Sequence, residues 1–269
     1  MARLGSMLHN LVRLARYRGL IQSLVARELK ARYRGSVLGF FWSFINPLAL
    51  LIIYSIVFKY FLIRGEDKLP PYEVFMFCGI LPWTWFSSSL LESSGVLISG
   101  GNLIKKVLFP AEVLPIVTVL ANMVHFFLGL PILLGFIVYN GMPLHVGELL
   151  WFPIVVVVQL ILTLGFALIL SALTVHFRDL RDILQNLMTF WFFTTPIIYR
   201  YTDMKPEVMR WLNLNPFTHI VITYQEILYF PGPVGHWYWL LVLGVISIVF
   251  FLFGYFVFDR LRDTFAEEV

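Results

Sequence analysis

Six long stretches of the chain contain no Asp, Glu, Lys or Arg, and they constrain the fold more than any other feature. They span residues 35–58, 74–91, 113–147, 149–177, 183–199 and 227–258. A helix needs about 20 apolar residues to cross the hydrocarbon core of a bilayer. The whole chain is 59% hydrophobic and only 13% charged, whereas soluble domains carry about 25% charged residues. The sequence therefore excludes a soluble enzyme and predicts an all-α membrane protein with six transmembrane helices.

The second and fifth stretches are shorter than the others. The stretch 74–91 is expected to continue past Glu92 towards Ile98, and the stretch 183–199 is short enough to end in irregular backbone. The stretches are apolar on all sides, whereas β-barrel strands alternate in polarity over about 10 residues. A β-barrel is therefore disfavoured.

The basic residues predict the orientation. Residues 1–34, 99–112, 176–182 and 259–269 hold 14 of the 20 Lys and Arg residues. Because basic residues gather on the cytoplasmic side, these segments and both termini are expected to be cytoplasmic. No signal peptide is expected, since residues 1–34 lack a sustained apolar stretch.

Residues 1–34 are predicted to form a cytoplasmic amphipathic segment ahead of a six-helix transmembrane domain, 35–269. Arg27, Lys30 and Arg34 fall on one face of a helix over 20–34, opposite an apolar face. Such a helix lies in the membrane interface. Two roles remain open for it: a simple anchor on acidic lipid, or recognition of an anionic substrate head group. The cationic residues that such recognition would use are Arg27, Lys30, Arg32 and Arg34.

Several motifs are absent from the chain. It has no phosphate-binding loop of the G-x-x-x-x-G-K-[ST] type, so an ATPase, if one is used, is expected on another chain. One Cys and six scattered His residues predict no metal site and no cofactor. Ion-driven carriers usually need buried carboxylates, and these stretches hold almost none. His125 is expected to be satisfied by a neighbouring helix rather than to relay protons.

Two cytoplasmic segments are candidates for docking a partner. Residues 99–112 combine helix-stopping glycines, four apolar residues and Pro110, which predicts a short capped helix with an apolar side. Residues 176–182 alternate in charge, and Arg178 and Asp182 are spaced to pair on a helix. The alternative in both cases is an ordinary loop that packs on its own bundle.

Aromatic residues are dense in the first and fifth stretches. Aromatic rings can stack on the apolar face of sugars, although any single ring is as readily explained by contact with lipid. The long external segment 200–236 contains four prolines and two apolar stretches. It is expected to form short re-entrant helices that act as a gate, or else a surface hairpin.

Motifs along nearly the whole chain resemble, in order, those of the ABC-2-type polysaccharide-export permeases, and among these the O-antigen exporters. The motifs are RELKARY (27–33), SVLG (36–39), WSFINP (42–47), LPWTWF (81–86), NLIKKVLFP (102–110), FRDL (177–180), TPIIY (195–199) and NP (215–216).

The resemblance implies a homodimeric permease of the bacterial inner membrane, paired with two ATPase subunits that hold ATP and Mg²⁺. It implies export of an undecaprenyl-diphosphate-linked polysaccharide, with contact to membrane lipid and no nucleic acid. The expected coupling residues are Asn102, Leu103, Ile104, Lys105, Lys106, Val107, Leu108, Phe109, Pro110, Arg178 and Asp179. The expected channel aromatics are Phe40, Trp42, Phe44, Tyr54, Phe58, Phe190, Trp191, Phe193 and Tyr199.

Other functions remain open. A teichoic acid or capsular polysaccharide exporter would share the same mechanism. A small-molecule exporter of the ABC-2 type fits the aromatic content less well. A membrane-embedded glycosyltransferase would need paired carboxylates on one side, and the external acidic residues lie beside Arg64 and Lys68 in what reads as a solvated loop.

Overall fold

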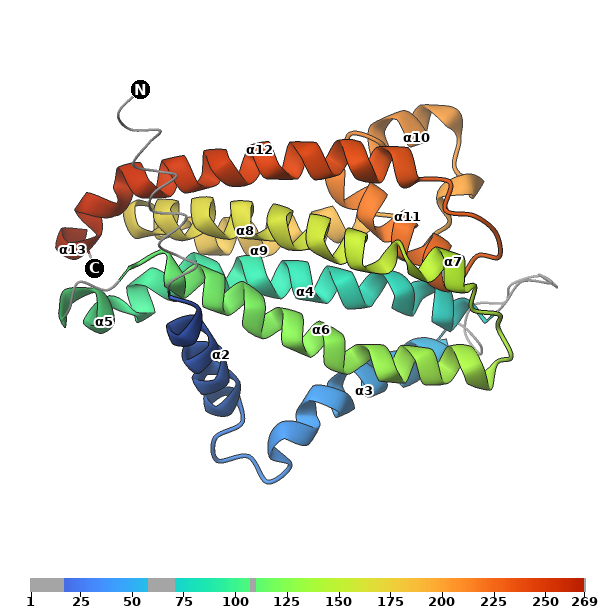
Figure 1. Ribbon diagram of the computed structural model, residues 1–269, viewed down its shortest axis with the longest axis horizontal. Helices are drawn as coiled ribbons and strands as arrows, with labels where there is room; N and C mark the ends of the chain where they lie inside the picture. Colours follow the sequence, from blue (N-terminus) through green and yellow to red (C-terminus); the bar gives the residue numbers. More distant parts are fainter. Residues whose placement is uncertain (1–16, 58–70, 107–109, 269) are drawn as a thin grey trace.

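The computed structural model describes residues 17–57, 71–106 and 110–268. Every regular element in these residues is a helix, so the predicted all-α class is confirmed. Figure 1 shows long helices side by side along one axis, with shorter elements at the two ends and along one side. We refer to these as the α5 end and the α7 end.

Within the described ranges, four helices are long and apolar enough to cross a membrane. They are α4 (Tyr72–Ser99), α6 (Val113–Tyr139), α8 (Phe152–His176) and α12 (Trp237–Leu261). Long apolar stretches form helices because a helix satisfies its backbone polar groups internally, as a bilayer requires. The extension of the second stretch past Glu92 is confirmed, since α4 runs on to Ser99.

The fifth stretch forms a shorter helix, α9 (Leu180–Phe193), whose 14 residues are fewer than the roughly 20 needed for a full crossing. Of the first stretch, α3 (Trp42–Ile56) is described up to the edge of residues that lie outside the described ranges. Helix α9 stops at Phe193 because Pro196 follows closely, and the residue before a proline avoids the helical conformation. The ending in irregular backbone is thus confirmed, while the count of six spans and the orientation stay predictions.

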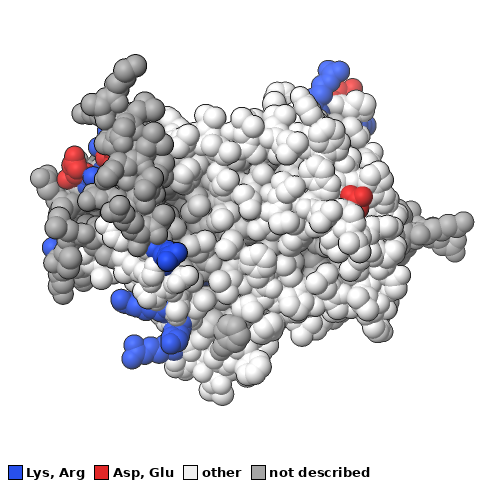
Figure 2. Space-filling view, viewed as in Figure 1, with Lys and Arg blue, Asp and Glu red and all other residues white. Residues whose placement is uncertain are grey.

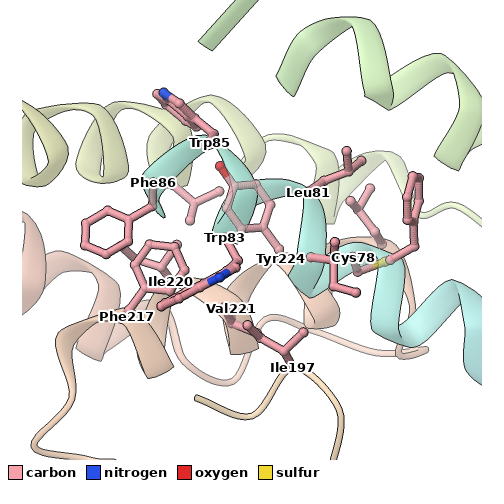
Figure 3. Packing of buried hydrophobic residues seen from close by; sticks show 14 of the residues in the cluster. Cys78, Leu81, Trp83, Trp85, Phe86, Ile197, Phe217, Ile220, Val221 and Tyr224 are labelled. Atoms are coloured by element: carbon pink, nitrogen blue, oxygen red, sulfur yellow. The ribbon is translucent and has the colours of Figure 1, made fainter. Parts of the chain in front are cut away.

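The core is centred on α4. The membrane-length window of α4 is 78% buried inside the chain, compared with 28% for α12. Aromatic side chains of α4 pack against α11 (Pro216–Leu228), as Figure 3 shows. The rings of Phe86 and Phe217 stack with centroids 4.5 Å apart, and Trp83 meets Phe217 edge-on at 5.3 Å.

Helices α8 and α12 approach each other through two glycines. A Cβ atom built on Gly254 would lie 2.6 Å from the backbone oxygen of Gly165. Only glycine allows the two backbones to come this close, as small residues do between helices in membranes. The backbones of α8 and α12 are therefore in direct contact at these two glycines.

Two elements project from the side of the bundle. Helix α2 (Arg18–Arg32) crosses steeply to the long helices, and η1 (Gly39–Phe41) leads into α3, so that α2 and α3 form a V in Figure 1. Gly35, with φ +81°, and Gly39, with φ +50°, supply the left-handed backbone of the connection. Helix α2 packs on α6, and α3 packs on α4 and α6.

Short elements close the two ends. At one end lie α5 (Gly101–Lys106), η4 (Arg262–Thr264) and α13 (Phe265–Glu268); at the other lie α7 (Val146–Leu149), η3 (Tyr201–Asp203) and α10 (Pro206–Leu212). The segment 200–236 does contain short helices, as expected. Helix α11 is almost wholly buried against α4, α8 and α12; whether it re-enters the membrane stays a prediction.

Candidate functional site

A polar pocket of about 200 Å³ lies inside the V, between α2 and α3 on one side and α4 and α6 on the other. Its polar lining comes from hydroxyl, amide, imidazole and guanidinium groups, and its apolar lining is partly aromatic. The polar side chains are Arg32, Tyr33, Ser43, Asn46, Thr84, Ser88, Asn122 and His125. Such a concentration is unusual beside membrane-length helices, where unpaired polar groups are costly.

One side of the pocket is an ion-pair network. The guanidinium of Arg32 pairs with the Glu92 carboxylate and donates a hydrogen bond to Asn122 Oδ1 at 3.0 Å. Asn122 Nδ2 in turn donates to Glu92 Oε2 at 2.7 Å. The charges of Arg32 and Glu92 thereby compensate each other, and the network ties α2 to both α4 and α6.

The other side is a chain of neutral groups. The Tyr33 hydroxyl lies 2.7 Å from Ser43 Oγ and 3.4 Å from His125 Nδ1. His125 is thus contacted at Nδ1 from the connection after α2, so the expected neighbour is present for one of its two ring nitrogens. Its other nitrogen, Nε2, is buried without a hydrogen-bond partner among the residues that the structure describes.

The four expected head-group cations divide into two sets. Arg27, Lys30 and Arg34 are exposed, and Figure 2 shows basic side chains gathered where α2 projects. Arg32 lies on the opposite side of α2, one turn after Glu28 and 3.8 Å from its carboxylate. The exposed cations are thus Arg27 and Lys30 of α2 and Arg34 just after it, which we together call the free face of α2; the amphipathic character of this segment stays a prediction.

Those of the expected coupling residues that the structure describes lie at the α5 end. Leu103 and Pro110 are half-buried, while Lys105 is exposed. Arg178 and Asp179 are exposed between α8 and α9 at the same end of the bundle. Val107, Leu108 and Phe109 lie outside the described residues, as do the side chains of Asn102, Ile104 and Lys106.

Phe177 lies within the docking candidate 176–182 but was not among the expected coupling residues. Its side chain is 66% exposed directly before the charged pair Arg178 and Asp179. An exposed aromatic ring beside charges is the type of residue that anchors protein interfaces. The signal that could have found it is its position: it is the one large apolar residue at the start of a charged connection.

The expected channel aromatics of α9 divide into exposed rings and a ring that faces the core. Phe190 and Phe193 of α9 are 67% and 59% exposed. Trp191 instead faces the core, where its ring lies 5.3 Å from that of Phe86 and its Nε1 donates to Asn215 Oδ1 at 2.7 Å.

The remaining channel aromatics are more varied. Trp42 is 38% exposed and donates to Ser36 Oγ. Phe44 and Tyr199 are half-buried, and the Tyr199 hydroxyl donates to the Phe193 carbonyl. The side chains of Phe40 and Tyr54, and all of Phe58, lie outside the described residues. Within one chain α3 packs on α4 and α6 whereas α9 packs on α4 and α8, so the exposed rings of the two helices belong to different sides of α4.

The α7 end carries a cluster that the sequence did not predict. The Glu226 carboxylate accepts from the ring Nδ1 of His236 at 2.8 Å and from its backbone N–H at 3.0 Å. The ring of His219 stacks on that of Trp239, with centroids 5.0 Å apart. These contacts hold the segment before α12 against α11. No group of three His, Cys, Asp or Glu side chains in the described ranges is placed to bind a metal.

The helices are apolar and of membrane length, and on the face seen in Figure 2 the described charged residues gather near the ends of the bundle and around α2, which is typical of a multi-pass membrane protein. The chain belongs to the ABC-2 type transporter family, whose model matches residues 19–229. It is 39% identical over 262 residues to the O-antigen export system permease protein RfbA of Myxococcus xanthus, covering 95% of this chain and 97% of that protein.

Two further relatives were found. The RfbA permease of Klebsiella pneumoniae is 32% identical, covering 92% of this chain and 94% of the relative. The polysialic acid transport protein KpsM of Escherichia coli is 24% identical, covering 87% and 90%. The family and these relatives identify the chain as a transport permease of the bacterial inner membrane and not as an enzyme.

Proposed function

We propose that this chain is the membrane half of an ATP-driven exporter of O-antigen polysaccharide, carried on undecaprenyl diphosphate. Two copies form the passage, and two ATPase subunits, which hold ATP and Mg²⁺, drive it. The observation that carries the proposal is an uncovered apolar stripe on α9. Ile183, Leu187, Phe190 and Phe193 are 47–67% exposed, and their spacing of three or four residues places them on one helix face.

This apolar stripe suits both contact with a second copy of the chain and contact with the sugar polymer. A second copy of the chain, facing the stripe, would shield it from lipid on that side. Aromatic rings that remain on the inner surface offer many weak and similar contacts to sugar faces. Such contacts let a polymer slide, whereas a single tight site would hold it in place. Relatives of this chain named as O-antigen export permeases support the choice of cargo.

The orientation follows from charge. The α5 end is assigned to the cytoplasm because Lys105, Arg178, Arg260 and Arg262 lie there, and basic residues stay on the cytoplasmic side. The ATPase docks on α5 and on the connection that carries Phe177, Arg178 and Asp179. An exposed aromatic ring flanked by charges provides both an anchor and a polar rim for such an interface.

The diphosphate head group is recognised by the free face of α2. Arg27, Lys30 and Arg34 are exposed there, and phosphate oxygens favour Arg and Lys donors. Arg32 does not join them, because Glu92 and Glu28 compensate its charge. The lipid tail stays in the bilayer beside the V while the glycan enters the passage.

Reversing two of these charges should weaken recognition of the lipid-linked glycan. In the Arg27→Glu, Lys30→Glu double variant we expect the concentration of lipid-linked glycan at half-maximal export to rise about tenfold or more, since each basic residue near an anionic surface contributes about 1 kcal/mol. Export is measured in vesicles that contain permease, ATPase and lipid-linked glycan, by protection of the glycan from an added glycosidase.

The matched control is Arg210→Glu, which reverses an exposed cation of α10 at the opposite end. It should leave the half-maximal concentration unchanged. Wild-type behaviour of the double variant would reduce α2 to a membrane anchor. Absence of any ATP-dependent protection in the wild-type vesicles would contradict the exporter itself.

Export of a capsular polysaccharide is the second candidate. It is favoured by the similarity to KpsM of Escherichia coli, which is named for polysialic acid transport. Deleting the gene separates the two: accumulation of a lipid-linked capsular polymer, with O-antigen still exported, would select the capsule. A teichoic acid cargo would be recognised in the same way.

A further inference from the structure

The C-terminal segment of the chain folds back onto the α5 end of the bundle. After α12, η4 leads into α13, which packs against both α5 and α8 (Figure 1). Thr264 Oγ1 lies 3.1 Å from Nε2 of His176, the last residue of α8. The segment therefore connects α12, α8 and α5, which are far apart in the sequence.

A small hydrophobic core, separate from the main one, lies at this end, and we call it the end cluster. Its buried members are Leu97, Ala111, Leu114, Leu168, Ala172, Val175, Tyr255, Phe258 and Phe265. They come from the ends of all four membrane-length helices and from α13. Phe265 is fully buried, and its ring meets that of Phe258 edge-on with centroids 5.2 Å apart. Leu103 of α5 packs against this cluster.

The cluster has little room to absorb a movement of α5. A Cβ atom on Gly100, between α4 and α5, would lie 2.7 Å from Leu114 Cδ1. Beside it, the Glu112 carboxyl is 5% exposed and lies near Arg262 and Asp259 of the C-terminal region. Burial raises the pKa of Glu112, an effect that the Arg262 charge partly offsets. Close-packed interiors transmit displacement rather than yield to it.

We propose that Phe265 is a positioning residue for transport, through which displacement of α5 reaches α8 and α12. Helix α5 is joined through the backbone to α4 and, through residues 107–112, to α6, so it moves these two directly. It reaches α8 and α12 through the end cluster, where Phe265 is the contribution of α13. The inference rests on the proposed docking of the ATPase on α5.

The test uses the permease–ATPase complex in vesicles and compares Phe265→Ala with Phe265→Leu. For Phe265→Ala we expect the ATPase to stay bound and ATP hydrolysis to remain within about twofold, while glycan exported per ATP falls about fivefold or more, because the cavity uncouples the packed helix ends. Phe265→Leu should restore most of this ratio. Phe256→Ala, which removes an exposed ring of α12, is the control and should leave the ratio unchanged.

A second measurement needs no change at Phe265. Spin labels are placed on cysteines introduced at Ser99, which lies at the junction of α4 and α5, and at Arg260; both are exposed at this end, Lys105 stays unchanged for docking, and the natural Cys78 is buried. If α5 and α12 move together, the distance between the labels stays the same when a non-hydrolysable ATP analogue is added. A change of more than about 3 Å, well beyond the flexing of a close-packed core, would overturn the inference.

The outcomes separate the inference from the proposed function. A Lys105→Glu variant should lose the ATPase, whereas Phe265→Ala should keep it. Suppose that Lys105→Glu loses the ATPase and that Phe265→Ala folds and exports as much glycan per ATP as the wild type. This result overturns only the role of Phe265. A Lys105→Glu variant that retains both ATPase and export contradicts docking on α5, and the inference falls with it.

Discussion

The Gly254→Ala variant should be much less stable than the wild-type chain. A Cβ at this position would lie 2.6 Å from the Gly165 oxygen and 3.3 Å from the Gly165 Cα. These are backbone atoms, so no side chain can rotate away, and α8 and α12 must separate. Overpacking of a tight core costs about 1–3 kcal/mol, and we expect a value near the upper end.

The stability is measured by thermal unfolding of purified permease in detergent. The matched control is Gly135→Ala in α6, where a Cβ would meet nothing within 4 Å. That variant should be neutral or stabilised by about 0.5 kcal/mol, because alanine lowers the entropy of the unfolded chain. Equal stability of the two variants would show that α8 and α12 are not in backbone contact.

The Phe190→Ala, Phe193→Ala double variant should nearly abolish glycan export. These two rings are the most exposed aromatic side chains of α9, and a stacked aromatic contact contributes about 0.5–1.5 kcal/mol. Loss of several such contacts from both copies of the chain should reduce export at least about tenfold. The ATPase should remain bound, because the rings lie away from the α5 end.

The control is Phe253→Ala, Phe256→Ala, which removes two exposed rings from α12. Helix α12 has the lowest buried share of the membrane-length helices, so its rings contact lipid and their loss should change export little. The assay is the ATP-dependent protection of glycan in vesicles. Export at the wild-type level in the α9 variant would show that α9 does not line the passage. An equal loss of export in the α9 and α12 variants would show a general effect of aromatic content.

The long helices could be predicted from the sequence because a single physical rule governs them. A charged side chain at the centre of a bilayer is costly, so the gaps between charges mark α4, α6, α8 and α12. Even the crossing of Glu92 by α4 was predictable, since Glu92 lies near one end of that helix. The start of α3 at Trp42 was less predictable, because composition does not indicate where backbone geometry interrupts a helix.

The orientation of individual side chains was harder to predict. Phe190, Trp191 and Phe193 are neighbours in an aromatic run, yet Trp191 is rotated by about 100° from Phe190 on an ideal helix and packs into the core. Arg32 was expected to recognise the head group together with Arg27, Lys30 and Arg34, but it lies one turn after Glu28 and faces away from them. Its pairing with Glu92, 60 residues away, could not be inferred, because a single sequence does not indicate which distant residues meet.

The contacts of the C-terminal segment were equally inaccessible. Phe265 lies in a short polar stretch, DTFAEEV, that resembles a solvated tail. Its burial depends on four helix ends that meet there only after the bundle has formed. The same holds for the Glu226–His236 pair at the α7 end.

The central position of α4 and the peripheral position of α12 have a consequence for the response to different lipids. A change in acyl-chain length acts on the helices that touch acyl chains, which tilt or bend to match the new thickness. Helix α12 faces that force directly, whereas α4 is enclosed by protein. Thinner or thicker membranes should therefore alter the tilt of α12 and leave the tilt of α4 unchanged.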